Sequence, residues 1–116
     1  MMAALELFKE TREDVQITIN AYLEKGELKL EGHDVGKIVK DAWGNGNSYE
    51  YFLSLSQEDT DKLFKKLGSS DKSDEQKLIT LKKSFSWEND FSEFSKYCEK
   101  NKIKTSFSSW SGTDWD

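Results

Sequence analysis

The chain has 116 residues, with 22 acidic and 17 basic side chains and a formal net charge of −5, and its only arginine is Arg12. This length suits one domain. An acidic chain with one arginine is a poor candidate for specific nucleic-acid binding, because arginine makes the paired contacts to phosphate and guanine.

The first element expected along the chain is a short helix over 3–11, because Leu5 and Phe8 stand one helical turn apart. The pattern then changes to a strict alternation of apolar and polar residues over 15–24. Such alternation predicts a strand with one buried face.

A hairpin follows, because Lys25 and Gly26 can form a two-residue turn and glycine accepts the positive φ that this turn requires. The partner strand is predicted over 27–31. Pairing across the turn places apolar side chains on one face, with Leu23 opposite Leu28 and Ala21 opposite Leu30.

Asp34 is predicted to cap a helix over 35–43 that stops at Gly44. A third strand is expected over 49–55, where tyrosine and leucine alternate with other residues. The helix prediction rests on the residues at its two ends, and the strand prediction rests on the alternation.

Two capping boxes then predict two helices. Ser56 with Asp59 opens a helix that stops at Gly68, and Ser73 with Gln76 opens the next. A third helical stripe runs to about residue 101 and contains Trp87, Phe91, Phe94 and Cys98.

A last strand is predicted over 103–107. The expected order is α-β-β-α-β-α-α-α-β. This order indicates an α+β domain over 1–116 with an antiparallel sheet of three to four strands and helices mainly on one face.

Candidates for chemistry are few. His33 could act as a general base, but it is the only histidine, and Cys98, the only cysteine, shares a stripe with three aromatic residues. The carboxylates form no calcium loop and no short catalytic motif occurs. We therefore predict no catalytic, cofactor-binding or metal-binding residues.

The strand alternation places two aromatic residues, Tyr22 and Phe52, on the sheet face opposite Leu23 and Leu53. If helices cover only the leucine face, these rings form a contact patch with a rim of charged residues, namely Lys29, Glu31 and Glu50. The alternative is that the C-terminal helices cover this face too.

The C-terminal stretch adds Trp110 and Trp115, the latter between Asp114 and Asp116. These tryptophans either fold back onto the domain or anchor a partner. The predicted protein-contact residues are therefore Tyr22, Phe52, Lys29, Glu31, Glu50, Trp110 and Trp115.

The stretch from Leu28 to Gly68 resembles a family of small, uncharacterised bacterial proteins. Three features carry the resemblance: a G-x-D-x-G turn at 32–36, an aromatic-Gly helix end at 43–44 and a Tyr-Glu-Tyr strand at 49–51. The resemblance implies a bacterial origin and no particular activity.

The leading functional prediction is a non-enzymatic protein-binding module, in its sharpest form an acidic inhibitor or immunity-type protein against a basic partner, or one that self-associates. The alternatives are a small enzyme that uses carboxylates or His33, and a nucleic-acid binder with a lysine face, formed by Lys62, Lys65, Lys66, Lys82 and Lys83. No cofactor and no membrane association are expected. The single thiol and the absence of an apolar span or a signal-like start favour the cytoplasm.

Overall fold

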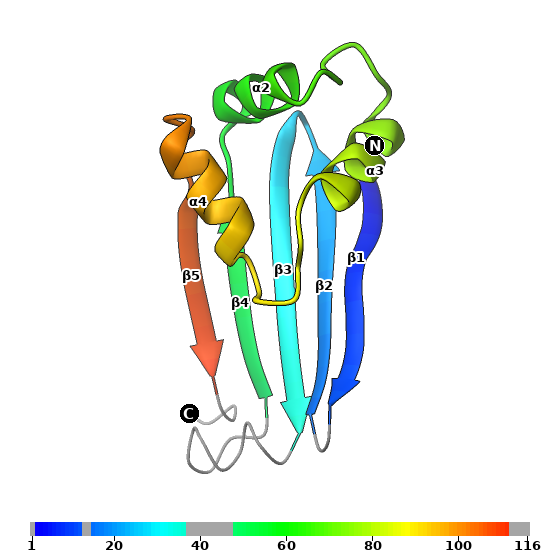
Figure 1. The fold of residues 1–116 in the computed structure, drawn as a ribbon, viewed down its shortest axis with the longest axis vertical. Coiled ribbons are helices and arrows are strands. Elements are labelled where there is room, and N and C mark those ends of the chain that lie inside the picture. Colours follow the sequence, from blue (N-terminus) through cyan, green and yellow to red (C-terminus); the bar gives the residue numbers. More distant parts are fainter. Residues whose placement is uncertain (1, 13–14, 37–47, 112–116) are drawn as a thin grey trace.

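The computed structural model describes residues 2–12, 15–36 and 48–111, and Figure 1 shows the arrangement of their elements. The strands are β1 (Met2–Arg12), β2 (Val15–Glu24), β3 (Glu27–Gly36), β4 (Ser48–Ser54) and β5 (Ser106–Ser111). The helices are α2 (Gln57–Lys66), α3 (Asp74–Ser84) and α4 (Ser92–Lys100).

The strands form one antiparallel sheet in which each strand pairs with the next along the chain, in the order β1-β2-β3-β4-β5. The predicted α+β class is confirmed. The sheet has five strands among the described residues, whereas three to four were predicted, and the element order differs at the N-terminus.

The predicted helix over 3–11 is wrong, because these residues form β1. The register between β1 and β2 shifts between Glu6 and Phe8, which is a β-bulge at Leu7. A bulge adds one residue to a strand. The bulge therefore separates two same-face residues, Leu5 and Phe8, by three positions, and this spacing imitates a helical turn.

The predicted hairpin is confirmed, with Leu23 paired to Leu28 and Ala21 to Leu30. Its turn residues have φ values of 54° at Lys25 and 79° at Gly26, as a type I′ turn requires. β3 continues to Gly36, beyond the predicted end of the strand.

Asp34 lies inside β3 and pairs with Ile17, so it does not cap a helix as predicted. Val35 also belongs to β3, which removes the predicted start of the helix over 35–43. The remainder of that predicted helix, with Gly44, lies outside the described residues. The third predicted strand is confirmed as β4.

The two predicted serine N-caps are present. The Ser56 side chain accepts a hydrogen bond from the Asp59 N–H, and the Ser73 side chain accepts one from the Gln76 N–H, each at 3.2 Å. These bonds satisfy donors that the first turn of a helix leaves unpaired. α2 is followed by Gly68 with a φ of 78°, the left-handed conformation of a helix stop.

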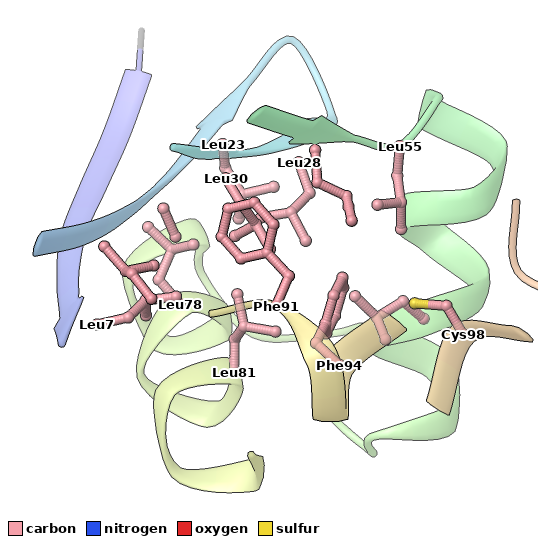
Figure 2. Close-up of a cluster of buried hydrophobic side chains, with 14 of the residues drawn as sticks. Leu7, Leu23, Leu28, Leu30, Leu55, Leu78, Leu81, Phe91, Phe94 and Cys98 are labelled. Atoms are coloured by element: carbon pink, nitrogen blue, oxygen red, sulfur yellow. The ribbon is translucent and has the colours of Figure 1, made fainter. Parts of the chain in front are cut away.

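α3 and α4 lie over one face of the sheet, and α2 lies beyond the ends of the strands at the top of Figure 1. Their apolar residues meet those of β1 to β4 in one buried cluster, part of which Figure 2 shows, with Leu7, Leu23 and Leu28 from the sheet and Leu81 and Phe94 from the helices. We call this the core face. Thr60 also links α2 to β3, because its buried hydroxyl accepts a hydrogen bond from the Leu28 N–H at 3.0 Å.

The predicted C-terminal stripe is buried, although its residues do not share one helix. Trp87 and Phe91 precede α4, while Phe94 and Cys98 lie within it. The last strand begins at Ser106, three residues later than predicted, and Ile103 is buried in the segment before it. None of the helices in the described part of the chain has the length and apolar run needed to cross a membrane.

Candidate functional site: the open face of the sheet

The sheet has a second face, turned away from the helices, which we call the outer face. Because successive residues of a strand point to opposite sides, every other residue of the five strands lies on it. Tyr22 and Phe52 belong to this face, as predicted, since their chain neighbours Leu23 and Leu53 are buried on the core face. The described helices pack on the core face, so the alternative that they also cover Tyr22 and Phe52 is not observed.

The outer face has a hollow of about 340 Å³ on its middle strands, near the turn that joins β2 and β3. Tyr22 pairs with Lys29, and Glu31 pairs with Phe52, so side chains from three adjacent strands surround it. The lining comprises Tyr22, Lys29, Leu30, Glu31, Phe52, Leu53 and Ser54. Four of the predicted contact residues are therefore neighbours.

The two aromatic side chains of this hollow are half-buried, although no described helix packs on them. The Tyr22 hydroxyl donates a hydrogen bond to Glu31 Oε1 at 3.0 Å. Burial, this hydrogen bond and the charge of Glu31 all raise the pKa of Tyr22. The hydroxyl thus stays protonated at neutral pH and holds the carboxylate in place.

The charged rim contains one lysine–glutamate ion pair and one histidine–glutamate contact. Lys29 Nζ lies 3.5 Å from Glu24 Oε1, and His33 Nε2 lies 3.7 Å from Glu50 Oε2. Exposed pairs of this kind contribute little stability. Glu50, another of the predicted contact residues, therefore lies beside His33, outside the lining of the hollow.

The two predicted tryptophans differ in how much of each the structure describes. The backbone of Trp110 lies in β5 and pairs with Glu50, so the chain around Trp110 is part of the sheet. The Trp110 side chain and the whole of Trp115 lie outside the described residues. The choice between a docked tail and a free anchor stays a prediction for both.

Of the two candidates for chemistry, Cys98 is 1% exposed and lies in the core. Burial, with a smaller contribution from the charge of Asp59, raises the pKa of its thiol to about 12. A thiol with so high a pKa is a poor nucleophile at neutral pH. His33 lies on the outer face, and its side chain is 44% exposed.

One polar cluster escaped the sequence analysis. The hydroxyl of Tyr51 lies 2.9 Å from Asp34 Oδ1 and 2.8 Å from Asp90 Oδ1, and Tyr51 itself is 2% exposed. Its pKa is raised, first by burial and then by the two carboxylates. This cluster joins the segment before α4 to the sheet, with Tyr51 buried and Asp90 exposed.

The pairing of β3 with β4 explains how the Tyr51 ring fits at this position. Tyr51 pairs with Gly32, and a side chain at Gly32 would collide with the tyrosine ring. The pattern Gly32-x-Asp34 in the sequence was the available signal, but it was attributed to a turn. Asp90 is 39 positions from Tyr51, and no local pattern connects them.

Metal binding gains no support from the described residues, in which no three histidine, cysteine, aspartate or glutamate side chains gather as ligands. Comparison of the chain with protein-family models, with curated proteins and with solved structures finds no match. The resemblance to small bacterial proteins therefore stays a prediction.

Proposed function

We propose that the protein is a non-enzymatic protein-binding module that docks a basic protein partner on its outer face. The observation that carries this proposal is the aromatic hollow between Tyr22 and Phe52, on a sheet face that the described helices leave open. Aromatic residues at the centre with a polar rim are the usual composition of a protein interface. An antiparallel sheet needs helices on one face only, so the second face is available for a partner.

The charge of the outer face supports a basic partner. Its described strand positions carry two lysines, Lys9 and Lys29, against five glutamates: Glu6, Glu24, Glu27, Glu31 and Glu50. The whole chain has a net charge of −5. Such a surface attracts a basic partner at long range, and the attraction weakens as salt rises.

The sharpest form of the proposal is an inhibitor or immunity-type protein of bacterial origin that acts in the cytoplasm by covering a basic toxin or effector. A protein that works by covering another needs a broad surface, and it does not need a catalytic group. The buried thiol of Cys98 is compatible with a reducing compartment.

The two alternatives have weaker support. An enzyme that uses His33 would work from an open surface, where water competes with every charged contact. The five lysines of the nucleic-acid hypothesis are exposed and divided between α2 and α3. Neither arrangement combines a hollow with aromatic walls.

Affinity capture from the source cells tests the proposal with three forms of the protein. Wild type is compared with the double variant Tyr22→Ala/Phe52→Ala and with a control, Lys65→Ala/Lys82→Ala, that alters two exposed helical residues. Bound proteins are identified by quantitative mass spectrometry, and bound nucleic acid is measured in parallel. Circular dichroism is used to check that all three forms are folded.

We expect a basic protein that wild type and the lysine variant retain and that the aromatic variant loses. Retention of the same proteins by all three forms would contradict the proposal. Nucleic acid that is lost only in the lysine variant would favour the second alternative. A second copy of this chain as the only captured protein would replace the basic partner by self-association.

A further inference from the structure

We infer that the hollow between Tyr22 and Phe52 receives an arginine side chain of the partner. This inference rests on the proposed function and adds the chemistry by which the outer face recognises its partner. It follows from the two aromatic residues of the lining, from the placement of one carboxylate and from the contact of the lining lysine with a different glutamate.

The shape follows from strand alternation. Leu30 and Leu53 line the hollow, yet their side chains are buried on the core face. At these two positions the outer face therefore consists of backbone, which forms the floor. Tyr22 on β2 and Phe52 on β4 stand on either side of β3, and they are offset by two residues along the strands because Tyr22 is level with Ser54. Both aromatic side chains border the hollow, so a flat group that enters it lies beside aromatic rings.

The carboxylate of Glu31 supplies the charge. Glu31 lies on β3 between the two aromatic strands, and one of its oxygens accepts the hydroxyl hydrogen of Tyr22 at 3.0 Å. A carboxylate accepts several hydrogen bonds, so Glu31 retains capacity for a donor from solvent. The tyrosine fixes its orientation before a ligand arrives, which lowers the entropic cost of binding.

The other charged groups around the hollow are already partnered. Lys29, the lysine of the lining, lies 3.5 Å from Glu24 Oε1. Glu50 lies beside His33 at 3.7 Å. These contacts leave Glu31 as the negative group for an incoming cation.

A guanidinium fits this arrangement better than an ammonium group. It is planar, it lies against aromatic rings, and it donates paired hydrogen bonds to a carboxylate. Lysine offers a compact, strongly hydrated charge that gains less from two ring faces. Two further hollows along α4 are lined by Lys96 with serine and glutamate residues and contain no aromatic ring.

The test is an NMR titration of the ¹⁵N-labelled protein with three short peptides. The peptides are acetyl-Gly-Arg-Gly-amide, the same peptide with lysine, and the same peptide with citrulline, which has nearly the shape of arginine without its charge. The matched protein variants are Glu31→Gln and Glu27→Gln. Both remove one negative charge from β3, but Glu27 does not line the hollow.

We expect the arginine peptide to shift the amide signals of Tyr22, Glu31 and Phe52, with an affinity at least threefold above that of the lysine peptide and tenfold above that of the citrulline peptide. Glu31→Gln should weaken arginine binding at least fivefold, and Glu27→Gln less than twofold. The glutamine carbonyl can still accept the Tyr22 hydrogen bond, so the hollow keeps its shape.

Equal binding of arginine and citrulline peptides, or equal effects of the two glutamine variants, would overturn the inference. The capture experiment separates this outcome from failure of the proposed function. If capture depends on Tyr22 and Phe52 while the arginine peptide does not bind the hollow, the protein-binding module stands and arginine recognition is wrong.

Discussion

The ring of Tyr51 lies directly over Gly32 on the neighbouring strand. A Cβ atom at Gly32 would be 2.0 Å from Tyr51 Cε2, a distance that real contacts do not reach. The missing side chain lets the ring cross β3, where its hydroxyl contacts Asp34 of the same strand and Asp90 of the segment before α4. One glycine thus determines how that segment is attached to the sheet.

Substitution Gly32→Ala tests this relationship. Gly32 does not have a positive φ, so alanine adds no backbone strain and acts only through its collision with the ring. We expect a loss of about 1–3 kcal/mol in the free energy of unfolding, the usual cost of overpacking. Urea denaturation measures it.

The control is the same substitution in a Tyr51→Ala background. If the ring is the obstacle, Gly32→Ala should cost much less there, because residues in contact give non-additive effects. Equal costs in both backgrounds would show that Gly32 is needed for another reason.

Removal of the Tyr51 hydroxyl gives a second prediction. Tyr51→Phe keeps the ring but leaves Asp34 and Asp90 without this donor, and we expect a loss of about 1–3 kcal/mol. Phe107→Tyr is a control, because Phe107 is 59% exposed and gains a hydroxyl without burying it. An unchanged stability of Tyr51→Phe would mean that the cluster does not stabilise the fold.

The same hydroxyl predicts an alkaline limit of stability. The pKa of Tyr51 is raised in the folded protein above its ordinary value of 10.0. Its contribution is fully present below pH 10 and is lost as pH rises further, because the unfolded chain then releases the proton first. Between wild type and Tyr51→Phe, the slope above pH 10 should differ by about 1.4 kcal/mol per pH unit.

Cys98 gives a third prediction. Its pKa of about 12 in the folded protein, against an ordinary value of 9.0, makes the native thiol unreactive. A thiol reagent at pH 8 should label it only as fast as the protein opens, and at once in 6 M guanidinium. Fast labelling of the native protein would reopen the enzyme hypothesis. Its contribution to stability is present below pH 9 and lost toward pH 12.

The core face and the outer face can be compared at two adjacent residues of β3. Leu30 is 1% exposed, and Leu30→Ala should cost about 2–5 kcal/mol. Lys29 is exposed, and Lys29→Ala should cost less than about 0.5 kcal/mol. Thermal melts that give similar losses for both would mean that the strand is not buried on one side.

The aromatic residues of the hollow give a fifth prediction. Tyr22→Ala and Phe52→Ala remove half-buried rings that contact cross-strand neighbours, so each should cost no more than about 1 kcal/mol. The melting temperature should therefore fall far less than in Leu30→Ala. A large fall for both would show that these rings belong to a core and would remove the structural reason for the proposed function.

Local patterns predicted the central part of the fold. The register of the hairpin could be predicted because two signals agree. Apolar and polar residues alternate on the strands that carry Leu23 and Leu28, and Gly26 suits the turn between them. The caps at Ser56 and Ser73 follow from contacts three residues apart. The face of Tyr22 and Phe52 followed from the same alternation.

The errors arose where tertiary structure overrides a local pattern. The bulge at Leu7 changed the spacing of apolar residues in β1, and a bulge is visible only in the pairing of β1 with β2. Asp34 has the chemistry of a cap, but pairing with β2 and β4 keeps it in a strand. The Tyr51 hydroxyl contacts both Asp34 and Asp90, residues far apart in sequence that no periodicity can bring together.

The central claim is that a partner occupies the outer face of the sheet. It is tested most directly by NMR chemical-shift mapping of the ¹⁵N-labelled protein with the purified basic protein from the capture experiment. The account predicts the largest shifts at Tyr22, Glu31 and Phe52 and little change in α2, α3 and α4. A footprint on the helices with an unchanged outer face would contradict it.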